Sequence, residues 1–395
     1  MNAISLRMPR PIILTFIGRY LPGYKAGGAL RTVANMAEAL SDEFDFRIVT
    51  SDRDSGDDAP YPSIDCCQWH RVGKALVYYL PAEEFSVRGC ARLIAATPHD
   101  TVYFQSFFSS FTIKPLMAMR LGLAGKTSRP VVAPRGEFYP GALAIRRTKK
   151  LCFLYAARLS GIHSRTLWQA SSEEEAVAIR DWFGPAEIAV APDLVATSST
   201  SSEERTQKTS GTLRAFFLSR ICPKKNLTGA LRMLAGVKGE VMFDIFGPVE
   251  DTGYWQECRK AMTELPGNIH ATYRGTIPHE AVPQTAAGYD LFLFPTAGEN
   301  FGHVIMEALS AGCPVLISDQ TPWRDLEAAK AGWDLPLEET DRFRSVLQTC
   351  VEMDETAHSL LRLGASRKGA SYANDRSVTE ANRELLRSAV RSRSL

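Results

Sequence analysis

The sequence predicts an α/β protein built from two doubly wound domains, each with a parallel sheet. Short runs that are apolar along their whole length, typical of strands buried on both faces, alternate with segments of helical periodicity. The alternation stops once, in ATSSTSSEERTQKTSGT (196–212), which offers almost nothing to bury, and then begins again. The length of 395 residues also exceeds what one hydrophobic core usually serves. We therefore predict two Rossmann-like domains joined by a linker near residue 200.

The first predicted domain spans residues 1–195. Its helices carry clear signals: in GGALRTVANMAEAL, Leu30, Val33, Ala37 and Leu40 fall on one face. SSEEEAVAIRDWFG combines a serine N-cap, acids in the first turn and a glycine stop. The expected strands are 11–18, 46–52, 101–106, 130–134, 166–171 and 187–192.

The second predicted domain spans residues 213–372, after the linker at 196–212. Its expected strands are 213–220, 241–247, 269–275, 291–296 and 314–319. The remaining segment, 373–395, has a helical composition and ends in an arginine-rich run. Two interpretations stand for this segment: a helix that packs back on the first domain, or a helix that frays in solvent.

Composition excludes several classes of protein. Hydrophobic residues make up 45% and charged residues 23%, as in a globular protein, and the net charge of +2 is too small to indicate nucleic-acid binding. Eight scattered cysteines, without a CxxC pair or a Cys/His cluster, predict no metal site and favour a reducing cytoplasm. No run approaches the ~20 apolar residues that span a bilayer. We expect a cytoplasmic protein that is soluble or lies on a membrane surface.

Candidate ligand-binding residues follow the predicted strands. In open α/β sheets, ligands bind beyond the carboxyl ends of the strands, where helix N-termini point. Gly27 and Gly28 follow the first strand and immediately precede a helix, so a phosphate could approach bare backbone N–H groups there. The alternative is that the two glycines only allow the chain to turn in an ordinary loop. The absence of a GxGxxG motif argues against a dinucleotide-binding dehydrogenase.

Two cations follow the first strand of the second domain, in SRICPKKN. Arg220 and Lys225 could reach one anion, the guanidinium gripping phosphate oxygens at two points and the lysine supplying a compact charge. A solvated basic turn is the alternative.

Two glutamates mark PTAGENFGHVIMEALSAG. Glu299 lies on a loop after a strand, and Glu307 lies in a helix expected to start near Gly302 and to stop at Gly312. His303, Glu307 and Ser310 would form the only polar stripe of that helix. Either both carboxylates face one crevice, or Glu299 is a helix-start acid and Glu307 a surface residue.

The chain resembles a known enzyme family. The spacing of Glu299 and Glu307 within GENFGHVIMEALSAGCPVL resembles the E-x7-E signature of retaining glycosyltransferases of the GT-B fold, in the version of family 4. Arg220 and Lys225 resemble that family's phosphate-binding pair, and residues 130–150 resemble the PRG-type loop of its bacterial polysaccharide enzymes. The paired glycines near residue 27 resemble its N-terminal glycine loop. The likeness covers most of the chain, is strongest over 213–325, and implies two domains that face each other across a cleft.

The resemblance implies a binding site for a nucleotide-sugar donor. Glu299, together with the backbone N–H groups of Asn300, Phe301 and Gly302, would hold hydroxyls of the transferred sugar. Glu307 would hydrogen-bond the ribose hydroxyls.

The same resemblance implies where the rest of the nucleotide binds. Arg220 and Lys225 would bind the diphosphate, helped by Gly27 and Gly28. The backbone from Gly275 to Ile277 would contact the edge of the nucleotide base. Fixed cations stabilise the charge that develops on the departing nucleoside diphosphate. One such pair at ~4 Å contributes roughly 4 kcal/mol at an effective dielectric of about 20, before desolvation. We therefore expect transfer without a metal or other cofactor, and front-side attack in which the leaving phosphate takes the acceptor's proton.

The chain departs from the family pattern in its first domain. Where many family members place a histidine, this sequence has Arg135, Gly136 and Glu137. Arg135 and Glu137 either contact the acceptor or the sugar, or form a structural Arg–Glu pair.

The acceptor is suggested by residues 146–158, RRTKKLCFLYAAR, which join a basic cluster to an apolar, aromatic stretch. This segment can lie on anionic lipid at the inner face of a bacterial membrane, which would make the acceptor a lipid-linked saccharide and the product a surface polysaccharide. A basic helix end that runs into the core is the alternative. Two rival functions also stand: a nucleotide-sugar epimerase of the same fold, and a non-catalytic nucleotide-sugar-binding protein.

Overall fold

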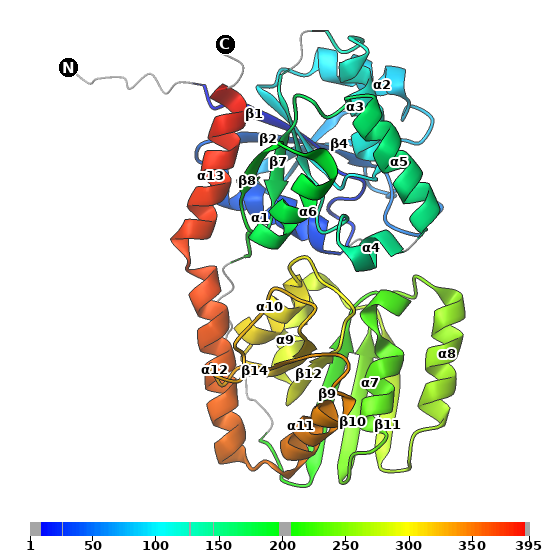
Figure 1. Ribbon diagram of the computed structural model, residues 1–395, viewed down its shortest axis with the longest axis vertical. Helices are drawn as coiled ribbons and strands as arrows, with labels where there is room; N and C mark the ends of the chain where they lie inside the picture. Colours follow the sequence, from blue (N-terminus) through cyan, green and yellow to red (C-terminus); the bar gives the residue numbers. More distant parts are fainter. Residues whose placement is uncertain (1–8, 26, 126–127, 145, 197–206, 392–395) are drawn as a thin grey trace, which may run out of the picture. The chain divides into compact units, whose positions relative to one another are not determined.

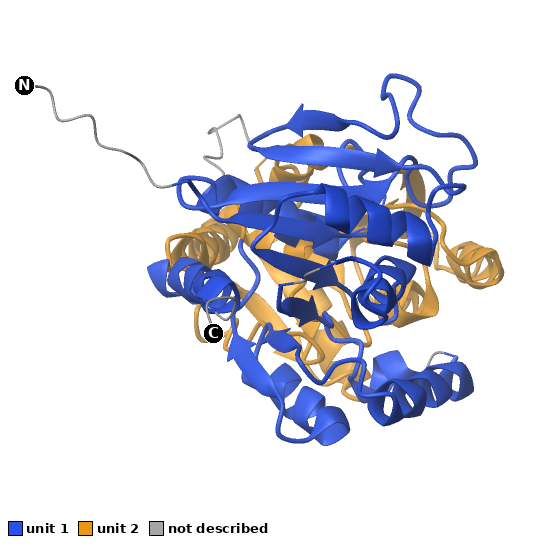
Figure 2. Cartoon of the chain, turned by 90° about the horizontal axis from the view of Figure 1, so that it is seen from above, with its two compact units in different colours: residues 1–194, 376–395 blue, residues 195–375 orange. Residues whose placement is uncertain are grey.

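The computed structural model describes residues 9–25, 27–125, 128–144, 146–196 and 207–391. The chain divides into two compact units: unit 1 comprises residues 1–194 and 376–395, and unit 2 comprises residues 195–375. Figure 2 shows the units in separate colours. Residues 197–206 of the predicted linker lie outside the described residues, and Thr212, its last residue, already begins a strand.

Unit 1 contains an eight-stranded sheet in the order β3-β4-β2-β1-β5-β6-β7-β8. Neighbouring strands are parallel except for β3 and β4, which form an antiparallel hairpin at one edge. The strands are β1 (Ile12–Phe16), β2 (Asp45–Ser51), β3 (Trp69–Val72), β4 (Ala75–Leu80), β5 (Thr101–Gln105), β6 (Pro130–Ala133), β7 (Leu167–Ala170) and β8 (Glu187–Val190).

The helices of unit 1 are labelled in Figure 1. They are α1 (Gly28–Leu40), α2 (Val87–Ala96), α3 (Ser110–Arg120), α4 (Pro140–Ala144), α5 (Arg147–Leu159), α6 (Glu173–Phe183) and the C-terminal α13 (Arg376–Arg391). Helix α13 packs against α1, and Arg387 Nε donates to a carboxylate oxygen of Glu43, just beyond α1, at 2.6 Å. The last described helix of the chain therefore completes the unit formed by the first 194 residues.

Unit 2 contains a six-stranded, wholly parallel sheet in the order β11-β10-β9-β12-β13-β14. Its strands are β9 (Thr212–Leu218), β10 (Glu240–Phe246), β11 (Ile269–Gly275), β12 (Leu291–Phe294), β13 (Val315–Ser318) and β14 (Gly332–Leu335). Its helices are the 3-10 turns η1 (Pro223–Lys225) and η2 (His279–Ala281) with α7 (Leu227–Leu234), α8 (Thr252–Thr263), α9 (Val282–Ala287), α10 (His303–Ser310), α11 (Thr340–Glu352) and α12 (Glu355–Ala373).

The predicted fold class is confirmed. Every residue of β5, β6, β7, β12 and β13 is buried, as expected of strands covered on both faces. The β3–β4 hairpin and strand β14 are absent from the predicted strands. No residue of β3 is buried and β14 has four residues, so neither gives a long apolar run, whereas β4 does contain one, ALVYYL, which the predicted strands omit.

The strand order fixes where a ligand is expected. In unit 2 the order reverses between the neighbours β9 and β12, and in unit 1 it reverses between β1 and β5. At such a switch point the connections leave on opposite faces of the sheet, so the loops at the carboxyl ends diverge and leave room for a ligand. In unit 2 these two loops are residues 219–226 and 295–302.

Candidate functional site

The two loops at the switch point of unit 2 are joined by hydrogen bonds. Asn226 Nδ2 donates to the carbonyl oxygen of Pro295 at 2.8 Å, and the backbone N–H of Ala297 donates to the carbonyl oxygen of Lys224, also at 2.8 Å. Thr296 Oγ1 donates to the same carbonyl at 3.2 Å. The loop after β9 and the loop after β12 are therefore fixed relative to each other.

Lys225 and Glu299 form an ion pair across these loops. The two side chains are 9% and 14% exposed, respectively, so the pair is largely withdrawn from water. Thr296 Oγ1 also lies 3.2 Å from Glu299 Oε1, and Lys225 Nζ lies 5.6 Å from the centre of the Phe294 ring. Two residues predicted from separate motifs thus lie in one cluster, where a charge-assisted hydrogen bond orients both.

Arg220 lies on the same loop as Lys225 but has a different partner. Its guanidinium pairs with Glu250, on the loop after β10, and the side chains are 40% and 48% exposed. The bridge between Ile221 and Val249 holds these two loops together. Lys224 lies between the two paired cations in sequence and is half-buried. We refer to Arg220, Lys224 and Lys225 as the cation loop.

The turn that carries Glu299 is fixed by its backbone. The N–H of Glu299 donates to the carbonyl oxygen of Gln320 at 2.8 Å, and Trp323 Nε1 donates to the carbonyl oxygen of Phe301 at 2.7 Å. Gly302 has φ 82°, and a Cβ there would lie 2.8 Å from Ile305 Cδ1, so any other residue would be strained at this position. Helix α10 begins at the next residue, which confirms the predicted helix start.

The polar stripe of α10 is its half-buried face, since His303, Glu307 and Ser310 are partly exposed. The buried residues of the helix are Ile305, Met306, Ala308 and Leu309. The carboxylate of Glu307 lies 3.4 Å from Nδ1 of His279, two residues beyond Ile277. The loop after β11, which contains the predicted base-edging segment Gly275 to Ile277, therefore reaches α10. The predicted roles of Glu307 and of this loop stay predictions.

Gly27 and Gly28 lie where the sequence places them, at the start of α1 in unit 1. Gly27 has φ 82° and ψ −151°, and no side chain caps the helix. The preceding turn is held by the buried carboxylate of Asp54, which accepts from the backbone N–H groups of Tyr24 at 2.8 Å and Lys25 at 3.1 Å. The binding role of the two glycines stays a prediction.

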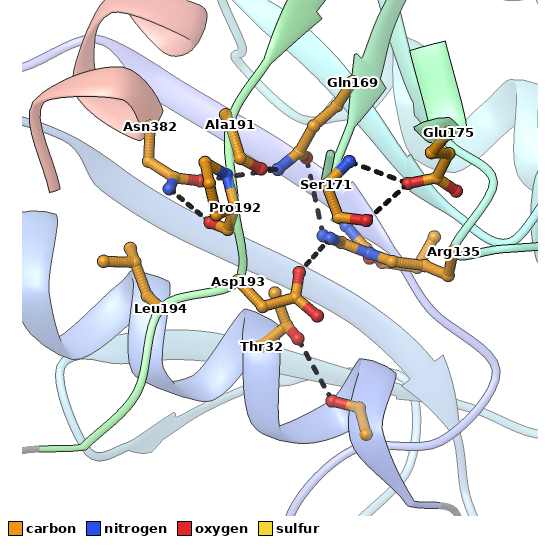
Figure 3. Close-up of polar contacts among 12 residues, drawn as sticks. Thr32, Arg135, Gln169, Ser171, Glu175, Ala191, Pro192, Asp193, Leu194 and Asn382 are labelled. Atoms are coloured by element: carbon orange, nitrogen blue, oxygen red, sulfur yellow. Dashed lines mark hydrogen bonds and ion pairs between the residues drawn. The ribbon is translucent and has the colours of Figure 1, made fainter. Parts of the chain in front are cut away.

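Arg135 lies in a buried network at the carboxyl end of β6 (Figure 3). Its guanidinium pairs with Asp193 and donates to Gln105 Oε1 at 2.9 Å and to Tyr103 Oη at 2.8 Å. A longer contact of 3.4 Å reaches Gln169 Oε1. The side chains of Arg135 and Asp193 are 8% and 4% exposed, so the two charges neutralise each other away from water.

Glu137 has partners of its own in the loop after β5. Its carboxylate accepts from Ser106 Oγ at 2.6 Å and from the backbone N–H groups of Phe107 and Phe108. Burial raises the pKa of Glu137, while these three hydrogen bonds oppose the shift. The alternative of a structural Arg135–Glu137 pair is therefore wrong, and the prediction that these two residues contact the acceptor or the sugar stays a prediction. Left-handed backbone at Arg135 (φ 57°) and Gly136 (φ 74°) separates the two side chains.

Three residues of these clusters are absent from the predicted set: Lys224, Glu250 and His279. Glu250 and His279 follow β10 and β11, so the strand-end rule that led to Glu299 would have found them if applied to those strands, whereas Lys224 lies beside Lys225 in the SRICPKKN motif itself. In the described part of the chain, no three His, Cys, Asp or Glu side chains gather as a metal-binding group would.

Solved structures identify the class of fold. The chain is similar to sucrose-phosphate synthase from Thermosynechococcus elongatus, with a TM-score of 0.70 and 14% identity over 96% of this chain and 99% of that one. It is also similar to Anabaena HepE in complex with UDP and glucose, with a TM-score of 0.69 and 17% identity over 96% and 99% of the two chains. The fold is GT-B, as predicted.

Comparison with known sequences gives a family match for most of unit 2. Residues 199–360 match the family model described as glycosyl transferases group 1, and this range contains the cation loop, Glu299 and Glu307. A curated relative, O-antigen chain mannosyltransferase B of Escherichia coli, is 30% identical over 113 residues. That match covers 27% of this chain and 29% of the relative's length.

Proposed function

We propose that this protein is a glycosyltransferase that moves a sugar from a nucleotide-sugar donor to a saccharide or lipid-linked saccharide acceptor. The observation that carries the proposal is the Lys225–Glu299 ion pair at the switch point of unit 2, beside Arg220 and within the range matched by the family model. The O-antigen mannosyltransferase among its relatives supports a role in bacterial surface polysaccharide synthesis.

In the proposed mechanism the cation loop stabilises the departing diphosphate. The bond between the anomeric carbon and the phosphate oxygen breaks, and the acceptor oxygen bonds the same face of that carbon, so that configuration is retained. A phosphate oxygen takes the acceptor's proton. Positive charge fixed near the leaving group favours this transition state over the ground state. With that charge supplied by side chains, we propose transfer that requires no metal ion. Glu299 orients the sugar and Glu307 the ribose.

The proposal is tested by donor binding followed by transfer. A melting-temperature screen of UDP-, GDP- and ADP-sugars should reveal one donor, because a ligand at about 100 times its Kd stabilises the protein by about 2.7 kcal/mol. With that donor, Lys225→Ala and Glu299→Ala should lower turnover by ~10²–10³-fold, as loss of one transition-state contact does. Lys238→Ala, which removes an exposed lysine of the same unit, is the matched control.

The same assay separates the rival functions. Unchanged turnover in both variants would remove the site assignment. An epimerised nucleotide-sugar formed without any acceptor would identify an epimerase, and donor binding with neither product would identify a binding protein.

We further propose that α5 rests on an anionic membrane from the cytoplasmic side. Basic residues open this helix, and Arg147 and Lys149 are exposed. On the same helix Tyr155 is 56% exposed and Leu159 is 87% exposed. Basic side chains contribute ~1 kcal/mol each near anionic lipid, and exposed apolar groups can enter the interface. No helix among the described residues is long and apolar enough to cross a bilayer.

Vesicle co-sedimentation tests the membrane proposal. The protein should bind vesicles that contain anionic lipid at low salt and should release at high salt. Leu159→Glu should weaken binding, whereas Leu360→Glu, at a position of unit 2 that is 53% exposed, should not. Absence of binding to anionic vesicles at low salt would refute the proposal.

A further inference from the structure

Helices α3 and α5 of unit 1 end in the same way. The first ends in Arg-Leu-Gly (120–122) and the second in Arg-Leu-Ser-Gly (158–161). Both glycines have left-handed backbone, with φ 69° and 60°, so the chain turns away from the helix there. The two leucines stay outside the core, because Leu121 is 64% exposed and Leu159 is 87% exposed.

Exposed apolar side chains are concentrated at these two helix ends. Of the ten large hydrophobic side chains that are exposed in the described part of the chain, five belong to them: Met117, Leu121, Leu123, Tyr155 and Leu159. Arg120 joins the two ends, since its guanidinium donates to the carbonyl oxygen of Gly161 and, at 2.8 Å, to Ser164 Oγ. We refer to residues 117–125 and 155–165 as the paired helix ends.

The paired helix ends carry positive charge and no negative charge. Arg120, Arg158 and Arg165 are exposed, and neither segment contains an aspartate or a glutamate. The partners of Arg120 are neutral oxygens, so no carboxylate compensates its charge there. His163 stays neutral, because burial and the nearby Arg120 lower its pKa to about 3. The charge of this surface is therefore that of its arginines.

This combination of side chains fits the surface of an anionic bilayer. Contiguous exposed apolar side chains mark a surface that binds a partner or a membrane. Leucines that enter the boundary between headgroups and acyl chains leave water, while arginines beside them interact with lipid phosphates. A carboxylate would be repelled by those phosphates, and the paired helix ends contain none. The charge of the surface thus selects anionic lipid as its partner.

The paired helix ends lie away from the sheet edge where a ligand is expected. Helix α3 leads into β6 and α5 leads into β7, so both helices end near the amino ends of strands, whereas Gly27 and Arg135 follow carboxyl ends. The basic start of α5, with Arg147 and Lys149, lies about 20 Å from its apolar end, since 13 residues rise about 1.5 Å each. A membrane contact at the paired helix ends therefore does not cover the loops at the carboxyl ends.

We propose that the paired helix ends insert into an anionic bilayer, with Leu121 and Leu123 at the end of α3 as anchors beside Leu159. This inference rests on the proposed membrane contact of α5 and adds a second element to it. The basic start of α5 attracts the protein to the lipid surface, and the paired helix ends hold it there.

Vesicle binding by the full-length protein tests the anchors. The vesicles contain phosphatidylcholine with or without phosphatidylglycerol. Leu121→Ser combined with Leu123→Ser removes apolar surface without adding charge, and should weaken binding to the anionic vesicles at least tenfold. The matched control is Leu360→Ser combined with Leu363→Ser on α12, where the leucines are 53% and 47% exposed, and it should bind as the wild type does.

Two further measurements separate insertion from electrostatic attraction. Lipids with brominated acyl chains should quench the added tryptophan of Leu121→Trp, but not that of Leu360→Trp, because only the first enters the bilayer. Arg158→Gln combined with Arg165→Gln should weaken binding at low salt and make it less dependent on salt, since screening acts on the charges alone.

The outcomes distinguish this inference from the proposed function. If the Leu121 and Leu123 variant binds as the wild type does while Leu159→Glu loses binding, the end of α3 is not an anchor and the proposed contact of α5 stands. If the wild type binds no anionic vesicle, both fail. Equal binding to neutral vesicles, or a wild-type dimer that the serine variant dissociates, would overturn the choice of partner. The donor-induced rise in melting temperature, measured on the same variants, tests the glycosyltransferase proposal separately.

Discussion

Each unit places an arginine just after the carboxyl end of a strand, and the two arginines are used in opposite ways. In unit 1, Arg135 is 8% exposed and its guanidinium is bonded to Asp193 and to neutral side chains, all within the protein. In unit 2, Arg220 is 40% exposed, and its ion pair with Glu250 is open to solvent. From sequence position alone, both arginines are equally good candidates for binding a ligand, because each follows the carboxyl end of a strand. Burial separates them.

The difference in burial between the two arginines determines whether each can bind a ligand. A buried arginine whose hydrogen bonds are satisfied fixes the elements around it, and a ligand could bind it only by breaking those bonds. An arginine with an exposed partner can exchange that partner for a phosphate at little cost. We therefore expect the variants of unit 1 to lose stability, and the variants of the cation loop to lose binding.

The largest loss of stability is expected for Arg135→Met. Asp193 would be left buried without the guanidinium that carries the opposite charge, and breaking a buried ion pair costs about 3–5 kcal/mol. Urea denaturation measures this loss. The matched control is Arg92→Met in the same unit, because Arg92 and its partner Glu84 are 74% and 52% exposed and such pairs contribute at most about 1 kcal/mol. Equal losses in the two variants would show that the Arg135 network does not stabilise unit 1.

A smaller loss is expected for Asn382→Leu, in the same network (Figure 3). Asn382 on α13 is fully buried, and its Nδ2 donates to the carbonyl oxygens of Pro192 at 2.8 Å and Val378 at 2.9 Å. Leucine would leave the Pro192 carbonyl oxygen without this donor, which costs about 1–3 kcal/mol. Hydrogen exchange should speed up in α13. Exchange rates unchanged in this helix would show that Asn382 does not anchor it to unit 1.

Local sequence pattern predicts most of the fold because buried parallel strands and amphipathic helices are short-range features. The runs at 291–296 and 314–319 contain β12 and β13, and GENFGHVIMEALSAG gives the start of α10 at the Gly302 cap. The β3–β4 hairpin is harder to predict. Its outer strand, β3, lies at the edge of the sheet and has no buried residue, so no apolar run marks it in the sequence.

The sequence predicts which charged residues follow the strand ends of the site, but not which of them form pairs. Glu299 and the lysines of SRICPKKN follow β12 and β9, and the reversal of strand order brings those two strands together. Which cation pairs with which carboxylate depends on loop conformation. The left-handed backbone of Asn226 (φ 56°) and its bond to Pro295 fix the end of the cation loop, and no spacing rule encodes that. The alternative of an Arg135–Glu137 pair fails for the same reason, because two left-handed residues follow each other there.

The smallest effect on stability, and the sharpest contrast with Arg135, is expected for Arg220→Met. Because Arg220 and Glu250 are 40% and 48% exposed, breaking their pair should change the free energy of unfolding by no more than about 1 kcal/mol. Binding of pyrophosphate and of the preferred nucleoside diphosphate should nevertheless fall at least tenfold, since a bidentate phosphate contact is lost. Glu250→Gln is the informative companion. It frees the guanidinium without removing it, so it should leave stability unchanged and tighten anion binding. If Arg220→Met instead destabilised the protein as much as Arg135→Met while binding was preserved, the two arginines would have the same structural role, and the contrast between the units would be wrong.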